Sequence, residues 1–148
     1  MTQVPPLDES NVSGYFNPQQ HIFYIHYKNR LSADASTKAY AWLFKYGVPM
    51  GNTIRAFIFD FTAVKRFQRD NTRATQNQSR RANATADLSA IPAALIVKTP
   101  YQEQLVLLSM KANKVEERTR ICHSQTEAHK FIIDFHKKYQ NQNAAQES

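Results

Sequence analysis

The sequence predicts an α/β fold: a single sheet of about four to five largely parallel strands, with four helices packed on it. The first observation behind this prediction is a repeated order, in which four apolar, strand-like runs are each followed by a segment of helical character. The second is that residues 56–61 are nearly all apolar, which is typical of a strand buried on both faces and therefore central in its sheet.

The strand-like runs cover residues 21–27, 54–61, 91–97 and 119–122. A first helix is predicted over residues 35–46, because Ala39, Trp42, Leu43 and Tyr46 follow the three-four spacing of a buried stripe. Residues 34–37, at the start of this helix, carry a helix-start signal. Gly47 is predicted to end this helix with a positive φ.

Two later helices begin with capping boxes, in which a hydroxyl and a Glu or Gln three residues on satisfy backbone amides reciprocally. One box is Thr99 with Gln102, and the other is Ser124 with Glu127. Residues 70–86 contain almost no large apolar side chain. We expect them to form either a shallowly packed helix or a helix-turn-loop segment.

A chain of 148 residues suits one domain. We predict an irregular N-terminal lead-in over 1–20, a single domain over 21–140 and a polar, frayed tail over 141–148. No apolar run is long enough to span a bilayer, and the first residues lack signal-peptide features. The expected location is the cytoplasm, where Cys122, the one cysteine, is predicted to be a buried and inert thiol.

A concentration of positive charge marks the candidate working surface. The chain has a formal net charge of +7, and residues 55–81 hold seven basic and two acidic residues. Ligands of open α/β sheets bind beyond the carboxyl ends of the strands, and arginines can contact phosphate or carboxylate groups. The predicted binding residues are Asp60, Thr62, Lys65, Arg66, Arg69, Asp70, Asn71, Thr72 and Arg73. Phe67 and Tyr101 could add stacking.

Structural alternatives exist for the same residues. Asp60 could instead bond local backbone amides, and the basic cluster could be a solvated helix face. The sequence contains no glycine-rich phosphate loop, no nucleophile elbow and no cysteine pair. His129 and His136 lie seven apart on one helical face, a spacing that matches no known set of metal ligands. We therefore predict no catalytic residue, no metal and no cofactor.

Two short stretches carry a resemblance to a known family. Residues 57–64, Phe-Ile-Phe-Asp-Phe-Thr-Ala-Val, resemble the apolar-apolar-Asp-apolar-Ser/Thr-x-Val stretch of STAS domains, the modules of anti-sigma-factor antagonists and sulphate transporters. Residues 120–131 resemble the last strand and helix of those domains and of their SpoIIAA-like relatives. In order of elements, the resemblance extends over about residues 21–139.

The resemblance implies a STAS/SpoIIAA-like fold and a regulatory or interaction module. Switching members of the family carry Asp-Ser-Ser/Thr-Gly after the Val, and a partner kinase phosphorylates the serine. Here Val64 is followed by Lys-Arg-Phe-Gln-Arg-Asp-Asn-Thr, with no serine or glycine at the matching place.

We therefore expect a non-enzymatic module of bacterial type that binds an acidic protein partner or a small ligand through residues 60–81. One alternative is a protein that binds nucleic acid or phosphate through the same basic segment. A second alternative is a small-molecule enzyme with Asp60 or a histidine as the acid-base group. A homodimer is compatible with this reading, and no membrane association is expected.

Overall fold

The computed structural model describes residues 3–68, 70–71, 73, 77–78, 80–81, 90–111 and 118–147. Six strands form one sheet in chain order: β1 (Leu7–Asp8), β2 (Val12–Asn17), β3 (Ile22–Leu31), β4 (Ala56–Phe67), β5 (Ala93–Ile96) and β6 (Thr119–Cys122). The pairs β1–β2 and β2–β3 are antiparallel, whereas β3 to β6 run parallel. The α/β class is therefore as predicted, but the sheet is mixed and has more strands than expected. The strand β4, whose first half (residues 56–61) is nearly all apolar, lies inside the sheet, as that composition predicted.

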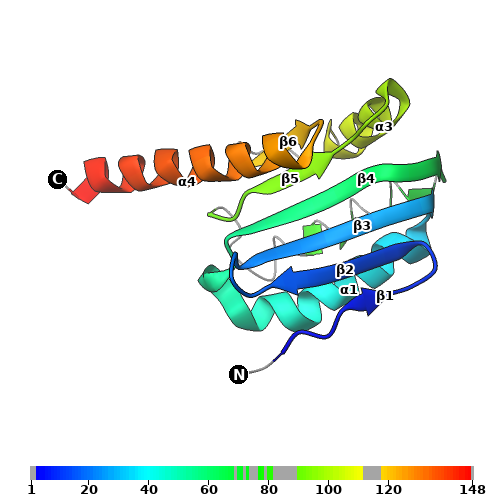
Figure 1. Cartoon of the computed structure of the whole chain (residues 1–148), viewed down its shortest axis with the longest axis horizontal. Helices are drawn as coiled ribbons and strands as arrows, with labels where there is room; N and C mark the ends of the chain where they lie inside the picture. Colours follow the sequence, from blue (N-terminus) through cyan, green and yellow to red (C-terminus); the bar gives the residue numbers. More distant parts are fainter. Residues whose placement is uncertain are drawn as a thin grey trace.

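The helices whose bounds fall in the described residues are α1 (Ala33–Gly47), α3 (Pro100–Lys111) and α4 (Gln125–Glu147), together with the 3-10 helix η1 (Val48–Thr53). The fourth predicted helix, over residues 70–86, falls mostly outside the described residues, although those described between 70 and 81 are helical. Figure 1 shows α1 and α4 on opposite sides of the sheet. Among the described helices, none has the length and apolar character needed to cross a membrane.

The largest departure from the prediction lies in residues 7–17, which form β1 and β2 and not an irregular lead-in. In β2 the side facing α1 is occupied by Val12, Gly14 and Phe16, so the apolar alternation of a strand is interrupted by a glycine. The ring of Trp42 fills that space, because a Cβ at Gly14 would lie 3.0 Å from Trp42 Cζ3. Trp42 also ties down the N-terminal segment by donating from Nε1 to the carbonyl of Pro5 at 2.9 Å.

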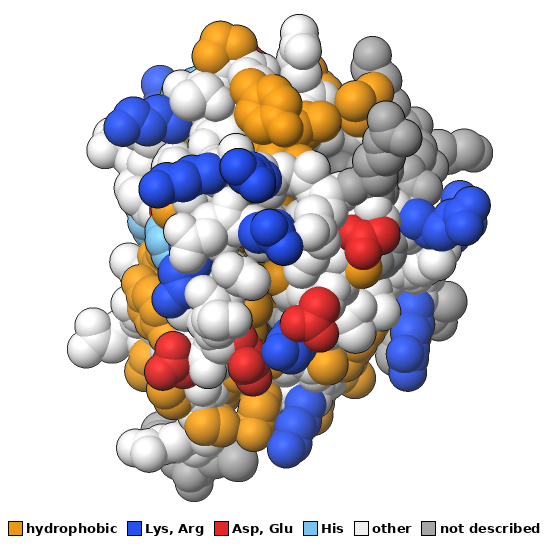
Figure 2. Space-filling view, turned by 90° about the vertical axis from the view of Figure 1, so that its right-hand side faces the viewer, with side chains coloured by type: hydrophobic (Ala, Val, Ile, Leu, Met, Phe, Trp, Pro, Cys, Tyr) orange, Lys and Arg blue, Asp and Glu red, His pale blue; other side chains and the backbone are white. Residues whose placement is uncertain are grey.

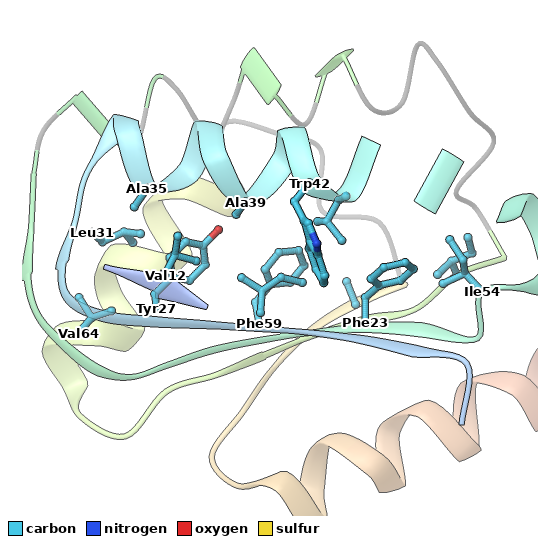
Figure 3. Packing of buried hydrophobic residues seen from close by; sticks show 14 residues of the cluster. Val12, Phe23, Tyr27, Leu31, Ala35, Ala39, Trp42, Ile54, Phe59 and Val64 are labelled. Carbon is cyan, nitrogen blue, oxygen red and sulfur yellow. The ribbon is translucent and has the colours of Figure 1, made fainter. Parts of the chain in front are cut away.

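The main core lies between α1 and the sheet (Figure 3). Phe23 is fully buried at its centre, with its ring edge-on to Trp42 at a centroid distance of 5.4 Å. On the other face, Ala128, Phe131 and Ile132 of α4 pack in a second cluster with apolar residues of β3, β4, β5 and β6. Alternate residues of β3 and β4 therefore face two different helices, which explains why the first half of β4 is apolar on both sides.

The start of α4 agrees with its predicted cap, whereas α1 starts earlier than predicted. Ser124 Oγ accepts from the Glu127 amide at 3.0 Å, and Glu127 Oε2 accepts from the His123 amide at 2.9 Å. The cap of α1 is Ser32, two residues before the predicted Asp34, and it accepts from the Ala35 amide at 3.2 Å.

Gly47 does not end α1 with a positive φ. Its φ is −85°, and the chain continues directly into η1, where Gly51 takes the left-handed conformation at 55°. At the other end of the chain, α4 extends to Glu147 across the tail that was predicted to fray. Cys122 is fully buried, as predicted, and this burial raises the pKa of its thiol to about 11.

Candidate functional site

The strand β4 extends to Phe67, so Lys65 and Arg66 are strand residues and not part of the helix predicted after residue 61. The pairing of β4 with β3 is interrupted twice. Two steps from His26 to Lys28 face three steps from Asp60 to Ala63, and a second extra residue precedes Arg66. Such bulges bend a strand and re-aim its side chains, and they are common beside functional sites.

The first bulge is fixed by Asp60, in the middle of β4. Its Oδ1 accepts from the Thr62 amide at 2.8 Å and from the Thr62 hydroxyl at 2.7 Å. Its Oδ2 lies 3.4 Å from Nδ1 of His26, its register partner on β3. Both carboxylate oxygens of Asp60 are thus engaged within the protein, in agreement with the structural alternative weighed for this residue.

Gln102 connects the same bulge to the start of α3. Its Nε2 donates to the carbonyls of Val64 at 2.9 Å and Thr62 at 3.3 Å. Its Oε1 accepts from the amides of Lys98 and Thr99, while its own amide donates to the Thr99 hydroxyl at 3.2 Å. The predicted capping box is therefore confirmed, and the Gln102 side chain additionally holds β4 against α3. Only 3% of this residue is exposed.

Beyond the bulges, basic side chains collect at the carboxyl ends of the parallel strands. We call this surface the basic edge, and it consists of Arg30, Lys65, Arg66 and Lys98, all of which are exposed. Arg30 and Arg66 are register partners, so two like charges lie on neighbouring strands. No ion pair to these four residues is formed within the described part of the chain.

An apolar surface borders the basic edge. The rings of Phe67 on β4 and Tyr101 on α3 meet edge to face at a centroid distance of 5.8 Å. Tyr101 is 54% exposed, and Leu108, two turns further along α3, is 57% exposed. Figure 2 looks onto this end of the molecule and shows a row of basic side chains across its upper half, next to an apolar patch. Phe67 and Tyr101, which the sequence analysis named as possible stacking residues, therefore lie side by side on one surface.

A second feature is a hollow of about 370 Å³ on the face of the sheet that carries α4. It is lined by Ser13, Gly14, Tyr15, Tyr24, Ile25, His26, Ile58, Asp60, Gln125 and His129. We call it the polar groove. Tyr15 and Tyr24 stack on one side of it with ring centroids 4.7 Å apart. Burial and the neighbouring Tyr15 raise the pKa of Tyr24.

The structure distributes the predicted site residues over several places. Asp60 lies in the polar groove with Thr62 beside it, and Lys65 and Arg66 lie on the basic edge. Asn71 is buried and accepts a hydrogen bond from the Ser36 hydroxyl, which makes it part of the packing against α1. Asp70 Oδ1 accepts from the Ala33 amide at 3.3 Å, at the start of α1. Arg73 is exposed, and Arg69 and Thr72 lie outside the described residues.

His26, His123, His129 and His136 each contact different partners. His123 lies between Glu103 and Glu127, while His26 pairs with Asp60. His129 Nε2 is 3.3 Å from the Tyr24 hydroxyl, whereas His136 Nε2 is 2.8 Å from the carbonyl of Arg55. Within the described chain, no three His, Cys, Asp or Glu side chains are grouped so that they could hold a metal ion.

Sequence reasoning missed Arg30, Ser13 and the pairing of His26 with Asp60. These residues are brought together by strand register, which a sequence pattern shows only when both strands are recognised. The signal available for His26 was its position in a period-two strand, on the face opposite Ile25 and Tyr27.

Comparisons with known proteins show a similarity of fold only. The structure is similar to solved structures that include an NMR structure of the protein TM1081. The two share 11% sequence identity and superpose with a TM-score of 0.54, over 89% of this chain and 90% of that one. No protein-family model and no curated protein sequence matches the chain.

Proposed function

We propose that this chain is a non-enzymatic, STAS-like regulatory or interaction module that docks an acidic segment of a partner protein on its basic edge. The observation that carries the proposal is the set of four exposed cations at the carboxyl ends of β3, β4 and β5, none of them neutralised within the described residues. Like charges on neighbouring strands disfavour each other, so an anionic partner relieves that repulsion when it binds.

The apolar surface beside the basic edge supports a protein partner. Exposed aromatic residues next to arginine are typical of the centres of protein interfaces. Tyr101 and Leu108 offer such a contact area within the reach of one short segment. We therefore expect the partner to present acidic residues together with at least one apolar anchor. Nucleic acid would use the basic edge but would gain little from Leu108.

Asp60 does not favour the enzyme alternative. A general base needs a lone pair directed at the substrate, and Thr62 and His26 already occupy most of the acceptor positions of Asp60. Asp60 instead holds the bulge after which the strand presents Lys65 and Arg66. Its role is to fix the backbone on which these two basic residues are positioned.

The experiment is a pull-down from nuclease-treated lysate of the source organism. The bait is wild type, an edge variant (Arg30→Glu, Lys65→Glu and Arg66→Glu) or a control variant (Arg55→Glu, Lys130→Glu and Lys137→Glu). The two variants change charge equally, but the control changes exposed residues away from the basic edge. If each reversal at the edge costs at least about 1 kcal/mol, the edge variant should bind the captured partner about 100-fold more weakly. The melting temperatures should stay nearly unchanged.

An acidic partner that binds wild type and the control variant, but not the edge variant, would support the proposal. Equal binding by both variants would contradict it. Material that is recovered only when nuclease is omitted, with steep weakening by salt, would replace the protein partner with nucleic acid.

A further inference from the structure

The polar groove is not part of the proposed docking surface. It lies on the face of the sheet that α4 covers only in part, since α4 packs mainly against β5 and β6. Its floor includes Ile58, and its walls come from β2, β3, β4 and the first turns of α4. A volume of about 370 Å³ is near the lower end of the usual range for small-molecule sites.

The negative charge in the groove is already satisfied by the protein. Asp60 is its one carboxylate: Oδ1 accepts two hydrogen bonds from Thr62, and Oδ2 lies 3.4 Å from Nδ1 of His26. The Tyr24 hydroxyl is engaged as well, because it donates to Gln20 Oε1 at 2.6 Å and lies 3.3 Å from His129 Nε2. A cationic ligand would therefore have to displace His26 from Asp60.

The groups left over can supply hydrogen-bond donors: Ser13 and Gln125 as they stand, and His26 from Nε2 when both ring nitrogens carry protons. Ser13 and Gln125 make no side-chain hydrogen bond within the described residues, and the Nε2 side of His26 is likewise without a partner there. Ser13 and His26 are register partners on β2 and β3, and Asp60 continues the same row on β4. A hydroxyl, an amide and an imidazole that carries both protons form a set of donors suited to a carboxylate.

We propose that the polar groove binds a small carboxylic acid with a short apolar or aromatic body. The carboxylate lies against His26, Ser13 and Gln125, and the body lies over Ile58 and beside the stacked pair of Tyr15 and Tyr24. The net charge of +7 draws anions toward the chain as a whole. This inference concerns a separate site and stands independently of the partner surface.

The test compares three ligands that share one ring and differ in charge: benzoate, benzamide and benzamidine. Backbone amide NMR of the full chain follows each titration. Benzoate should shift the resonances of Tyr24, His26 and Gln125 with a dissociation constant of about 1 mM, which is realistic for so small a molecule. Benzamide should bind at least fivefold more weakly, and benzamidine should not bind.

Two variants locate the site. His26→Gln removes the ring that balances Asp60, so benzoate binding should fall at least fivefold and benzamidine should begin to bind. His136→Gln, on the same helix as His129 but bonded to the Arg55 carbonyl, should leave all three titrations unchanged. Benzamidine binding to the wild type in preference to benzoate, equal binding of all three ligands, or no shift at the groove would each overturn the proposal.

Discussion

Replacement of Gln102 with leucine is expected to lower the free energy of unfolding by about 3 kcal/mol. The substitution removes a buried amide that donates to two carbonyls of the β4 bulge and accepts from two amides at the start of α3. Each polar group left buried without a partner costs about 1–3 kcal/mol, and water entering the site would recover part of this loss.

Urea denaturation measures this change, and Gln104→Leu is the matched control because Gln104 is an exposed residue of the same helix. A loss below about 1 kcal/mol for Gln102→Leu would mean that the bulge holds its shape without this side chain. The expected loss also has a functional counterpart. Lys65 and Arg66 follow the bulge, so the variant should weaken partner binding even at temperatures where it remains folded.

Replacement of Phe23 with alanine is expected to destabilise the fold by about 3–5 kcal/mol. Phe23 is fully buried and touches Trp42 and Phe16, so the cavity opens between α1 and the part of the sheet that contains β2. Ile133→Ala, at a residue that is 46% exposed on α4, is the control and should cost less than about 1 kcal/mol.

Equal losses for these two variants would contradict the position of the core. Because the Trp42 ring packs against Phe23 and also fills the space above Gly14, the Phe23→Ala variant should in addition destabilise the pairing of β2. Faster hydrogen exchange at residues 12–17 would report this coupling.

The elements that could be predicted are those whose secondary structure is indicated by residues close together in the sequence. The strands β3 to β6, the helices α1, α3 and α4 and both capping boxes follow from periodicity and cap chemistry within a few neighbouring residues. β2 was missed because the apolar position at Gly14 is filled by Trp42, a residue 28 positions later in the chain. The extent of β4 was underestimated because two bulges break its alternation, so the polar run after Phe61 resembled a helix.

The candidate site was predictable only in part, for the same reason. Lys65 and Arg66 were found from composition, and Asp60 from its place in an apolar strand. Arg30, Ser13 and His26 join them through register across the sheet, which no local pattern contains. Asn71 shows the opposite error: a polar residue in a polar segment proved to be buried against α1 and bonded to Ser36.

The most direct test of the basic edge as the docking surface is amide hydrogen exchange of the wild-type chain, with and without the captured partner. We predict slower exchange in the complex at residues 28–31, 64–68 and 98–108, and no change along the outer side of α4. Protection confined to α4, or to β1 and β2, would place the partner elsewhere and contradict the assignment.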